Sequence, residues 1–313
     1  MPEETNPTNE SEVTLPPDAA TSDDQRNPRR RRDPDPESLG LLIQTDERHD
    51  LSRIVLTADI RGDVATALRA IALREQMDAV WRLAEIDSST RTALNFYGPP
   101  GTGKTRVALG IAHRLRRPLL QVDYSGIISK YLGDTAKHLV RVFREATEVG
   151  AILLFDEADS MLSRRVNMDQ SCATSINQNR NVLMQELDRF QGVVIFTTNL
   201  FANYDEALVR RIGRHIRFQL PNRRQRTEIL RLHLPASDRV DADLAAVAEA
   251  AKGLSGGDLK NVCVNAMFAA SVGDDPRLWR VSEDLLLDEV EKVRAAKRDH
   301  SHVVVSDPQI SAN

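Results

Sequence analysis

A glycine-rich stretch that ends in a lysine and a hydroxyl residue is the clearest chemical feature of this 313-residue sequence. It fits the pattern G-x-x-x-x-G-K-[ST], and its residues are Gly98, Pro99, Pro100, Gly101, Thr102, Gly103, Lys104 and Thr105. Backbone N–H groups of such a loop surround phosphate oxygens, and the N-terminus of the following helix adds positive potential. Lys104 is expected to reach the β- and γ-phosphates, and the Thr105 hydroxyl to bind Mg²⁺. The stretch therefore predicts a site for ATP and Mg²⁺.

Two adjacent carboxylates, Asp156 and Glu157, follow the apolar run 151–155. In open α/β sheets, ligands gather at the C-terminal ends of the strands, so both side chains are expected to face the phosphates. Asp156 is predicted to hold Mg²⁺, directly or through water, and Glu157 to polarise the attacking water as general base. An Asp-Glu pair after a strand can instead begin a helix. The phosphate loop upstream favours the catalytic interpretation.

The elements that position these residues follow from the spacing of apolar side chains. Short apolar runs alternate with amphipathic helical patterns, which predicts a parallel sheet covered by helices on both faces. Val64, Leu68 and Ile71 recur at helical spacing after Asp63, a plausible N-cap. The five predicted strands are 93–97, 119–122, 151–155, 193–196 and 216–220. After Pro221 we expect no further strands, and four helices at 226–232, 241–251, 256–271 and 281–296.

The ends of the chain differ in composition from this α/β region. Residues 1–38 are rich in Pro, Asp, Glu, Asn and Thr, which predicts a disordered tail because so little apolar surface can be buried. The run 29–32 of four arginines is flanked by acidic residues, so a solvated tail is favoured over a localisation patch. We expect a large α/β ATPase domain at 39–221, a small helical lid domain at 222–298 and a flexible tail at 299–313.

The composition of the chain limits the classes of partner that we expect it to bind. A formal charge of −4 and 4% aromatic residues argue against nucleic-acid binding. The only two cysteines, Cys172 and Cys263, lack metal-ligand spacing, which favours a reducing compartment. No apolar run reaches the roughly 20 residues of a membrane helix, and the N-terminus lacks the apolar stretch of a signal peptide. The expected location is the cytoplasm, with no membrane partner.

Together with these motifs, residues 51–294 resemble the AAA ATPases, whose phosphate loop has the same amino-acid sequence. The resemblance implies an AAA-type P-loop domain, with a central parallel sheet flanked by helices, followed by a small helical lid. The run 194–199 resembles the sensor-1 strand, so Asn199 is expected to hold the attacking water or the γ-phosphate. The run 253–259 resembles the start of the sensor-2 helix, which implies that Gly256 and Gly257 approach the adenine. No arginine occupies the sensor-2 position, and Ser255 with Asp258 also forms a plausible capping box.

The same resemblance implies a site shared between subunits. The run 207–211 resembles the segment that supplies arginine fingers to a neighbour, which makes Arg210 and Arg211 catalytic candidates. The sequence departs from the common pattern after Arg210, so Arg211 and Arg214 remain an alternative pair. The run 129–134 resembles the central-pore loop, with Lys130 and Tyr131 gripping a substrate chain. A homohexamer that threads a protein substrate is therefore expected.

The sequence of residues 177–190, together with Asn203–Glu206 and His215–Phe218 downstream, resembles the sequences of the bacterial relatives of the pachytene-checkpoint ATPases. That resemblance implies disassembly of HORMA-domain signalling complexes in an antiviral system. Two alternatives stay open. One is a general disassembly or unfolding ATPase, and the other is a non-threading scaffold or nucleic-acid switch that depends on ATP.

Overall fold

The structure, a computed structural model, describes residues 40–82, 85, 92–123, 135–162, 170–199, 204–235, 237–272 and 275–306. Predictions that lie outside these ranges concern the N-terminal tail at 1–38, the pore residues Lys130 and Tyr131, Asn203 of the run 203–206, and the end of the C-terminal tail at 307–313. None of the helices in the described ranges is long and apolar enough to cross a membrane.

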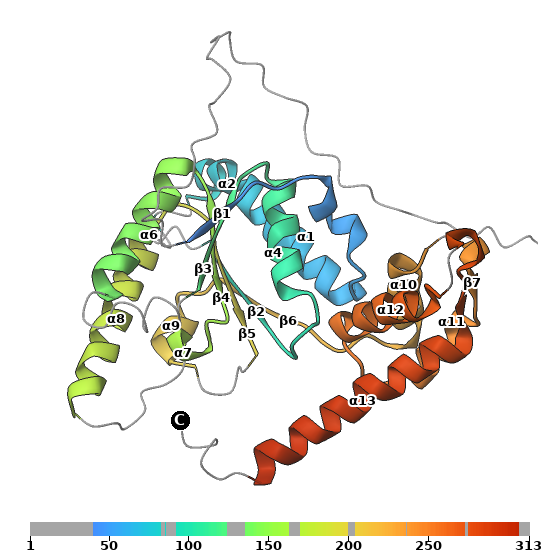
Figure 1. Ribbon diagram of the computed structural model, residues 1–313. Coiled ribbons are helices and arrows are strands. Elements are labelled where there is room, and N and C mark those ends of the chain that lie inside the picture. The colour runs from blue at the N-terminus through green and yellow to red at the C-terminus, as the bar shows by residue number, and fades with distance from the viewer. Residues whose placement is uncertain are drawn as a thin grey trace, which may run out of the picture. The chain divides into compact units, whose positions relative to one another are not determined.

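A six-stranded sheet forms the centre of the α/β region, in the order β1-β3-β4-β5-β2-β6 (Figure 1). Five strands are parallel, and β1 pairs antiparallel with β3 at one edge. The predicted α/β class with a central parallel sheet is therefore confirmed. The strands are β1 (Leu41–Ile43), β2 (Ala93–Tyr97), β3 (Leu119–Asp123), β4 (Ile152–Asp156), β5 (Val194–Thr198) and β6 (Arg214–Arg217).

The predicted bounds of β6 are wrong: Ile216–Leu220 was expected and Arg214–Arg217 is observed, so the strand starts two residues and ends three residues earlier. This strand lies at the sheet edge and pairs with β2 alone. Only Ile216 among its four residues is buried, so its side chains give little of the continuous apolar signal of a central strand.

Helices cover both faces of the sheet (Figure 1). Side chains alternate along β4: Leu153 and Phe155 face one hydrophobic cluster, and Ile152 and Leu154 face the other. The first cluster includes side chains of α6 (Thr135–Val149) and α8 (Gln170–Arg189). The second includes side chains of α1 (Ala58–Ala72) and α4 (Lys104–Arg114). This packing holds the strand ends in fixed positions.

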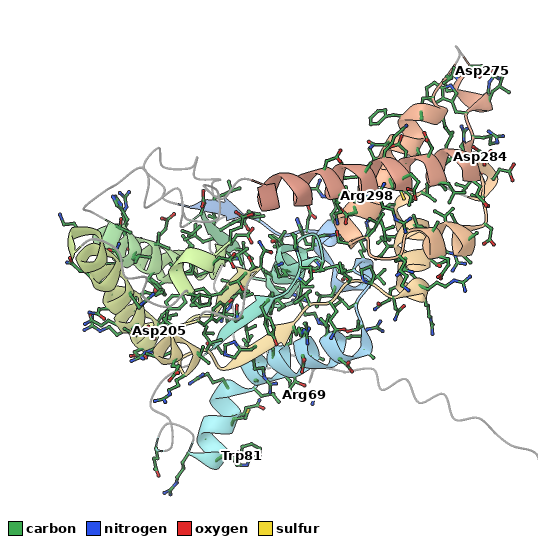
Figure 2. All side chains as sticks on the ribbon, turned by 90° about the horizontal axis from the view of Figure 1, so that it is seen from below. Arg69, Trp81, Asp205, Asp275, Asp284 and Arg298 are labelled. Carbon is green, nitrogen blue, oxygen red and sulfur yellow. The ribbon has the colours of Figure 1, made fainter. Side chains whose placement is uncertain are left out.

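The predicted N-cap of the first helix, Asp63, is wrong. Helix α1 begins after Thr57, whose Oγ1 accepts a hydrogen bond from the Ile60 N–H at 3.2 Å. A threonine in this place satisfies one of the free N–H groups at the helix start, so the chain becomes helical earlier than its apolar pattern indicates. Helix α2 (Arg74–Trp81) follows, and Trp81 projects from its end with a 63% exposed side chain (Figure 2).

A third hydrophobic cluster belongs mainly to the helices after Pro221. They are α10 (Arg223–His233), α11 (Leu244–Ala250), α12 (Gly256–Ala270) and α13 (Glu283–Ser306). The expectation that strands end at Pro221 is wrong, since β7 (Val240–Asp241) and β8 (Val281–Ser282) form a small parallel pair. Two-residue strands are too short to show a period in the sequence.

The last helix also differs from its predicted length. Helix α13 continues to Ser306, past Asp299, where the sequence analysis places the start of a tail. Once a helix is nucleated, each further residue adds a backbone hydrogen bond, so a helix can extend beyond its last packed side chain. The remaining short elements are α7 (Asp159–Leu162), α9 (Glu206–Val209), η1 (Glu47–His49), η2 (Leu51–Arg53), η3 (Ser237–Arg239) and η4 (Pro276–Leu278).

Candidate functional site

The C-terminal ends of β4, β5 and β2 are neighbours in the sheet, and each leads into predicted site residues. The phosphate loop follows β2, Asp156 ends β4, and Asn199 follows β5. These ends line a cleft of about 340 Å³ that also includes residues of α10 and α12. Parallel strands with helices on both faces bring their carboxyl ends to one edge, so residues about 100 positions apart meet here.

The loop between β2 and α4 needs glycine at three positions. Gly98, Gly101 and Gly103 have φ values of +139°, +73° and +95°, which side chains with a Cβ rarely adopt. A Cβ on Gly98 would also collide with the Phe218 carbonyl oxygen, and one on Gly101 with the Ser255 hydroxyl. The glycines therefore allow both the turn and the close approach of the chains on either side.

The ammonium group of Lys104 connects two strand ends. Its Nζ donates to Gly98 O at 2.7 Å, to Pro99 O at 3.0 Å and to Asn199 Oδ1 at 2.9 Å. Lys104 is only 8% exposed, and burial lowers its pKa, while the carboxylates of Asp159, Asp156 and Glu157 act in the opposite direction. The three acceptors and three carboxylates stabilise a buried positive charge at the place where phosphate charge is expected.

Asp156 lies at the centre of a hydroxyl and amide network. Its carboxylate accepts from Thr105 Oγ1 at 3.0 Å and from Gln121 Nε2 at 2.9 Å, and it also accepts from the Thr197 hydroxyl. Thr105 and Asp156 are the two predicted Mg²⁺ ligands, and the structure brings them together. Gln121 and Thr197, on the two neighbouring strands, fix the orientation of the carboxylate.

Glu157 and Asn199 lie on either side of this network. Glu157 is exposed and has φ +53°, a left-handed backbone conformation that is unusual for a residue other than glycine. Its N–H donates to Thr197 Oγ1 at 3.2 Å. The Asn199 N–H donates to the Asp159 carboxylate at 3.0 Å, and its Oδ1 accepts from Lys104. Glu157 lines the cleft from this turn, and Asp159 fixes the backbone of Asn199.

The start of α12 closes the cleft on the side of the small helical region. Ser255 and Asp258 form the predicted capping box, which is confirmed. Asp258 also contacts Lys297 on α13. The Gly257 N–H donates to Gly101 O at 2.9 Å, and both Gly256 and Gly257 line the cleft. The small helical region thus contacts the phosphate loop through backbone atoms.

An apolar wall completes the cleft. It is formed by Ile54, Val55, Leu56, Ile60, Ile229 and Leu232. His233 lies beside this wall, and burial lowers the pKa of its imidazole, with Arg106 and Lys260 acting in the same direction. A neutral imidazole and aliphatic side chains suit the flat, largely apolar faces of a nucleobase.

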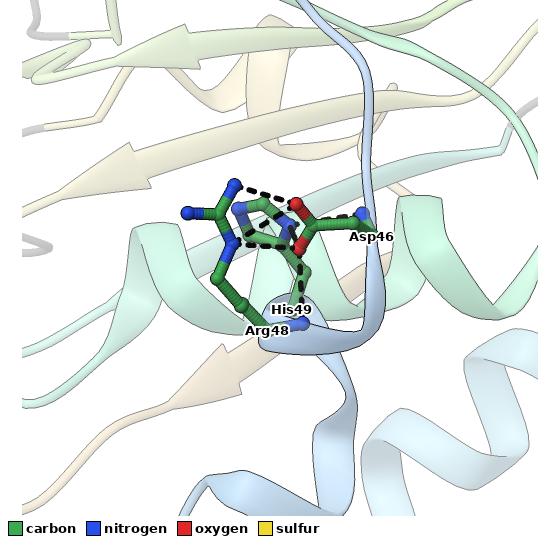
Figure 3. A network of polar contacts seen from close by, with 3 residues as sticks. All are labelled: Asp46, Arg48 and His49. Atoms are coloured by element: carbon green, nitrogen blue, oxygen red, sulfur yellow. Dashed lines mark hydrogen bonds and ion pairs between the residues drawn. The ribbon is translucent and has the colours of Figure 1, made fainter.

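Two short 3₁₀ helices lie directly before the first residues of this wall. Asp46 caps η1, and its carboxylate binds the side chain of Arg48 and accepts from the Arg48 N–H, while its own N–H donates to His49 Nδ1 at 3.1 Å (Figure 3). Hydrogen bonds to Arg48 lower the pKa of Asp46 to about 2, so the cap stays ionised. The next turn packs Leu51 against Gly110 of α4. The segment that starts the wall is therefore anchored to the helix after the phosphate loop.

The candidate arginines follow α9 and do not line the cleft among the residues that the structure describes. Arg210 is exposed. Arg211 binds its own chain: Nε donates to Asp188 Oδ1 at 3.0 Å, and Nη1 donates to Ala207 O at 3.1 Å. Arg214 opens β6. Lys104 and Glu157 line the cleft, and none of these three arginines does so.

Several site residues were not predicted from the sequence. Gln121 is a polar residue in the middle of the apolar run 119–122, and this interruption is a signal that could have marked it. Thr197 was quoted only as part of the run 194–199. Asp159 gave no signal of its own, because its contact with Asn199 spans 40 positions. The apolar wall at 54–56 gave none either, since single aliphatic residues near a loop do not indicate a ligand.

Comparison with known proteins shows which family and which individual proteins this chain is similar to. Residues 94–220 match the family described as ATPase family associated with various cellular activities (AAA). The chain is 35% identical over 211 residues to the 26S proteasome regulatory subunit 10B homolog A of Arabidopsis thaliana, covering 64% of this chain and 52% of that protein. It is 36% identical over 208 residues to the proteasome-activating nucleotidase of Aeropyrum pernix, covering 64% and 50%. The chain spans about half the length of these curated relatives.

Solved structures agree on the fold. The crystal structure of the FIGL-1 AAA domain matches with a TM-score of 0.63 at 19% identity, covering 81% of this chain and 85% of that one. The same domain in complex with ADP matches with a TM-score of 0.54 at 23% identity, covering 68% and 77%. At these identities the likeness shows a common fold.

The close contact at Gly98 makes a direct prediction. Gly98→Ala is expected to raise the Kd for ATP at least about tenfold, since relieving a backbone strain of about 1–3 kcal/mol requires the loop to move. Gly62→Ala is the matched control, because Gly62 lies in α1 with nothing near its Cβ. The control should bind ATP normally and gain about 0.5–1 kcal/mol of stability. Calorimetric titration measures both, and normal binding by Gly98→Ala would contradict the loop geometry.

Proposed function

We propose that this chain, which carries an AAA-type ATPase domain, hydrolyses ATP in a homohexameric ring and uses the energy to remodel a protein substrate. The observation that supports the activity is the convergence of Lys104, Thr105, Asp156, Glu157 and Asn199 at one cleft. These side chains bind phosphate, hold a divalent cation and position water, which are the three tasks of phosphoryl transfer to water.

The donor set at Thr105 and Asp156 fits Mg²⁺. A hydroxyl and a carboxylate lie 3.0 Å apart, and both offer hard oxygen ligands. Among the described residues no group of three or more His, Cys, Asp or Glu could hold a metal. Mg²⁺ is usually bound by one or two protein groups with phosphate oxygens and water, so two protein ligands suffice. When bound, the ion neutralises charge on the phosphates and orients them.

The remaining residues act on the phosphate and the attacking water. Lys104 binds the terminal phosphates and neutralises charge that develops there. Glu157 takes a proton from the attacking water, and its exposed carboxylate can reach water on the solvent side of the cleft. Asn199 accepts from Lys104 through its Oδ1, which leaves its side-chain NH₂ to donate to the γ-phosphate or to orient the attacking water.

The arginines support a shared site. Arg210, Arg211 and Arg214 do not line the cleft of their own chain, although a guanidinium at the γ-phosphate is worth roughly 10³–10⁵ in rate in comparable enzymes. Arg210 is exposed on the surface beyond α9. A ring in which each subunit offers its arginines to the next would complete every cleft, which is why we propose an oligomer.

A protein substrate is supported by the relatives and by the sequence of the pore segment. Two of the relatives are named for the proteasome, as a regulatory subunit and as an activating nucleotidase. Lys130 and Tyr131 lie outside the described residues, and we propose that they grip the substrate chain. An aromatic side chain offers a large contact area that tolerates many sequences.

The narrower substrate class that we propose is a HORMA-domain protein of an antiviral signalling system. This proposal rests on the sequences of residues 177–190, 203–206 and 215–218. In that case the ring would pull on a terminal segment of the closed HORMA domain and end its signal.

Mixed rings test the shared site. An Arg210→Ala/Arg211→Ala variant and a Glu157→Gln variant should each lose about 10²-fold or more in ATPase rate. Mixing them should restore activity, because one variant has intact carboxylates and the other intact arginines. Arg189→Ala, which removes a 75% exposed arginine side chain at the end of α8, is the control and should keep the wild-type rate. Absence of rescue in rings shown to be mixed would refute action in trans.

A substrate trap tests the remodelling role. The Glu157→Gln variant in ATP should retain its protein substrate on an affinity column, because the nucleotide binds and is not hydrolysed. Adding Tyr131→Ala should release that substrate while nucleotide binding stays unchanged. Recovery of a HORMA-domain protein supports the narrower class, and recovery of other proteins rejects it. Retention that is indifferent to Tyr131, or an ATPase rate stimulated by nucleic acid alone, would count against threading of protein.

A further inference from the structure

Two buried hydroxyl groups link the end of β5 to the residue before the N-cap of α9. Thr198 is the last residue of β5, and Tyr204 precedes Asp205, the N-cap of α9. Thr198 Oγ1 and Tyr204 Oη share a hydrogen bond, and the two residues are 1% and 5% exposed. Burial raises the pKa of Tyr204 to about 12, so its hydroxyl keeps its proton at neutral pH. This bond joins the phosphate side of the sheet to the start of α9.

On the phosphate side, Thr198 is one peptide away from Asn199. Both residues line the cleft. Asn199 Oδ1 accepts from Lys104 Nζ at 2.9 Å, and its N–H donates to Asp159 at 3.0 Å. A phosphate that draws the Lys104 ammonium away changes the partner of Asn199. Since the two residues share a peptide bond, a shift of Asn199 reaches the Thr198 hydroxyl.

On the arginine side, the N-terminus of α9 is anchored to buried groups. The Asp205 N–H donates to Leu162 O at 3.0 Å, and its carboxylate caps α9 by accepting from the Ala207 N–H at 2.8 Å. The same carboxylate (labelled in Figure 2) forms an ion pair at 3.3 Å with Arg180 of α8, which is 6% exposed. Helix α9 has only four residues, so its orientation is set by these contacts more than by its own hydrogen bonds.

The C-terminus of α9 is connected to the strand that carries the phosphate loop. His215 Nε2 lies 3.4 Å from Val209 O, and its Nδ1 lies 3.3 Å from Asn95 Nδ2 on β2. Burial lowers the pKa of His215, which favours a neutral ring that donates through Nε2 and accepts through Nδ1. Arg210 and Arg211 follow directly after Val209. The start and the end of α9 are therefore both connected to strands that lead into the cleft.

We propose that the Thr198–Tyr204 hydrogen bond couples the phosphate end of a subunit's own cleft to the arginines that it offers to the next subunit. Tyr204 is then a positioning residue, which acts through α9 on hydrolysis in the neighbouring cleft. This inference rests on the shared site proposed above. It adds that the arginines are placed according to the state of the cleft behind them.

Tyr204→Phe removes the hydroxyl and keeps the ring that fills the core. It should lower the kcat of the homogeneous ring about tenfold, within the range usual for coupling between sites, and leave the KM for ATP within about twofold. The KM is expected to hold because Tyr204 does not line the cleft. Unchanged kcat in a folded ring would overturn the proposal. Thermal unfolding and light scattering confirm fold and ring size.

Mixing with the Glu157→Gln variant separates action on the neighbour from action on the subunit's own site. A Tyr204→Phe subunit beside a Glu157→Gln subunit receives arginines from a chain with an intact Tyr204. Its rate should therefore equal that of wild-type subunits mixed with Glu157→Gln at the same ratio. Lys104→Ala is the control. It impairs the subunit's own cleft, so mixing with Glu157→Gln should not restore its activity. If Tyr204→Phe behaves like this control, Tyr204 acts in its own cleft and the proposal fails.

The partner hydroxyl gives a second, independent variant. Thr198→Val should lower kcat and Thr198→Ser, which keeps the hydroxyl, should restore it. The double variant Thr198→Val/Tyr204→Phe should be no slower than the slower single variant, because each removes the same bond. Additive losses would overturn the proposal. If Tyr204→Phe does not fold, the comparison of Thr198→Val with Thr198→Ser decides the matter, and an unchanged kcat in a folded Thr198→Val ring overturns the proposal. Failure of the Arg210/Arg211 mixture would instead reject the shared site itself.

Discussion

The buried ammonium of Lys104 is the interaction on which the rest of the site depends. A positive charge that is only 8% exposed is costly unless polar groups surround it. Its three acceptors come from two strand ends, Gly98 and Pro99 after β2 and Asn199 after β5. The charge therefore fixes the distance between the phosphate loop and the end of β5. The same donors could serve phosphate oxygens, so in the function we propose one group both organises the site and binds the nucleotide.

A second constraint is the close approach of backbones around the loop. Gly101 meets the start of α12, where the Gly257 N–H donates to its carbonyl. Gly98 meets Phe218, the first residue after β6. Because these contacts involve backbone atoms, the small helical region can follow the shape of the loop. A change in the loop is then transmitted to α12, and through Asp258 and Lys297 to α13.

The site was predictable from the sequence where local spacing determines the geometry. The loop 98–105, the strand before it and the helix after it follow one another without interruption, so their arrangement is a local property. Asp156 and Glu157 were recognisable because an apolar strand presents them at its end. In contrast, Gln121, Asp159 and the Arg211–Asp188 pair depend on contacts between distant parts of the chain, and their residue types are common on any surface. The positive φ of Glu157 and the two-residue strands β7 and β8 leave no periodic signal.

The most direct test of this account is ATP binding by a Lys104→Met variant, which keeps the aliphatic length and removes the charge. The account predicts a Kd for ATP raised about 10²-fold or more in calorimetric titration, since a charge-assisted bond to phosphate and the order of Asn199 are lost together. The free energy of unfolding should fall little, because the substitution removes the cost of burying a charge together with the hydrogen bonds of that charge. An unchanged Kd in the folded variant would contradict the assignment of this cleft to the phosphates of ATP.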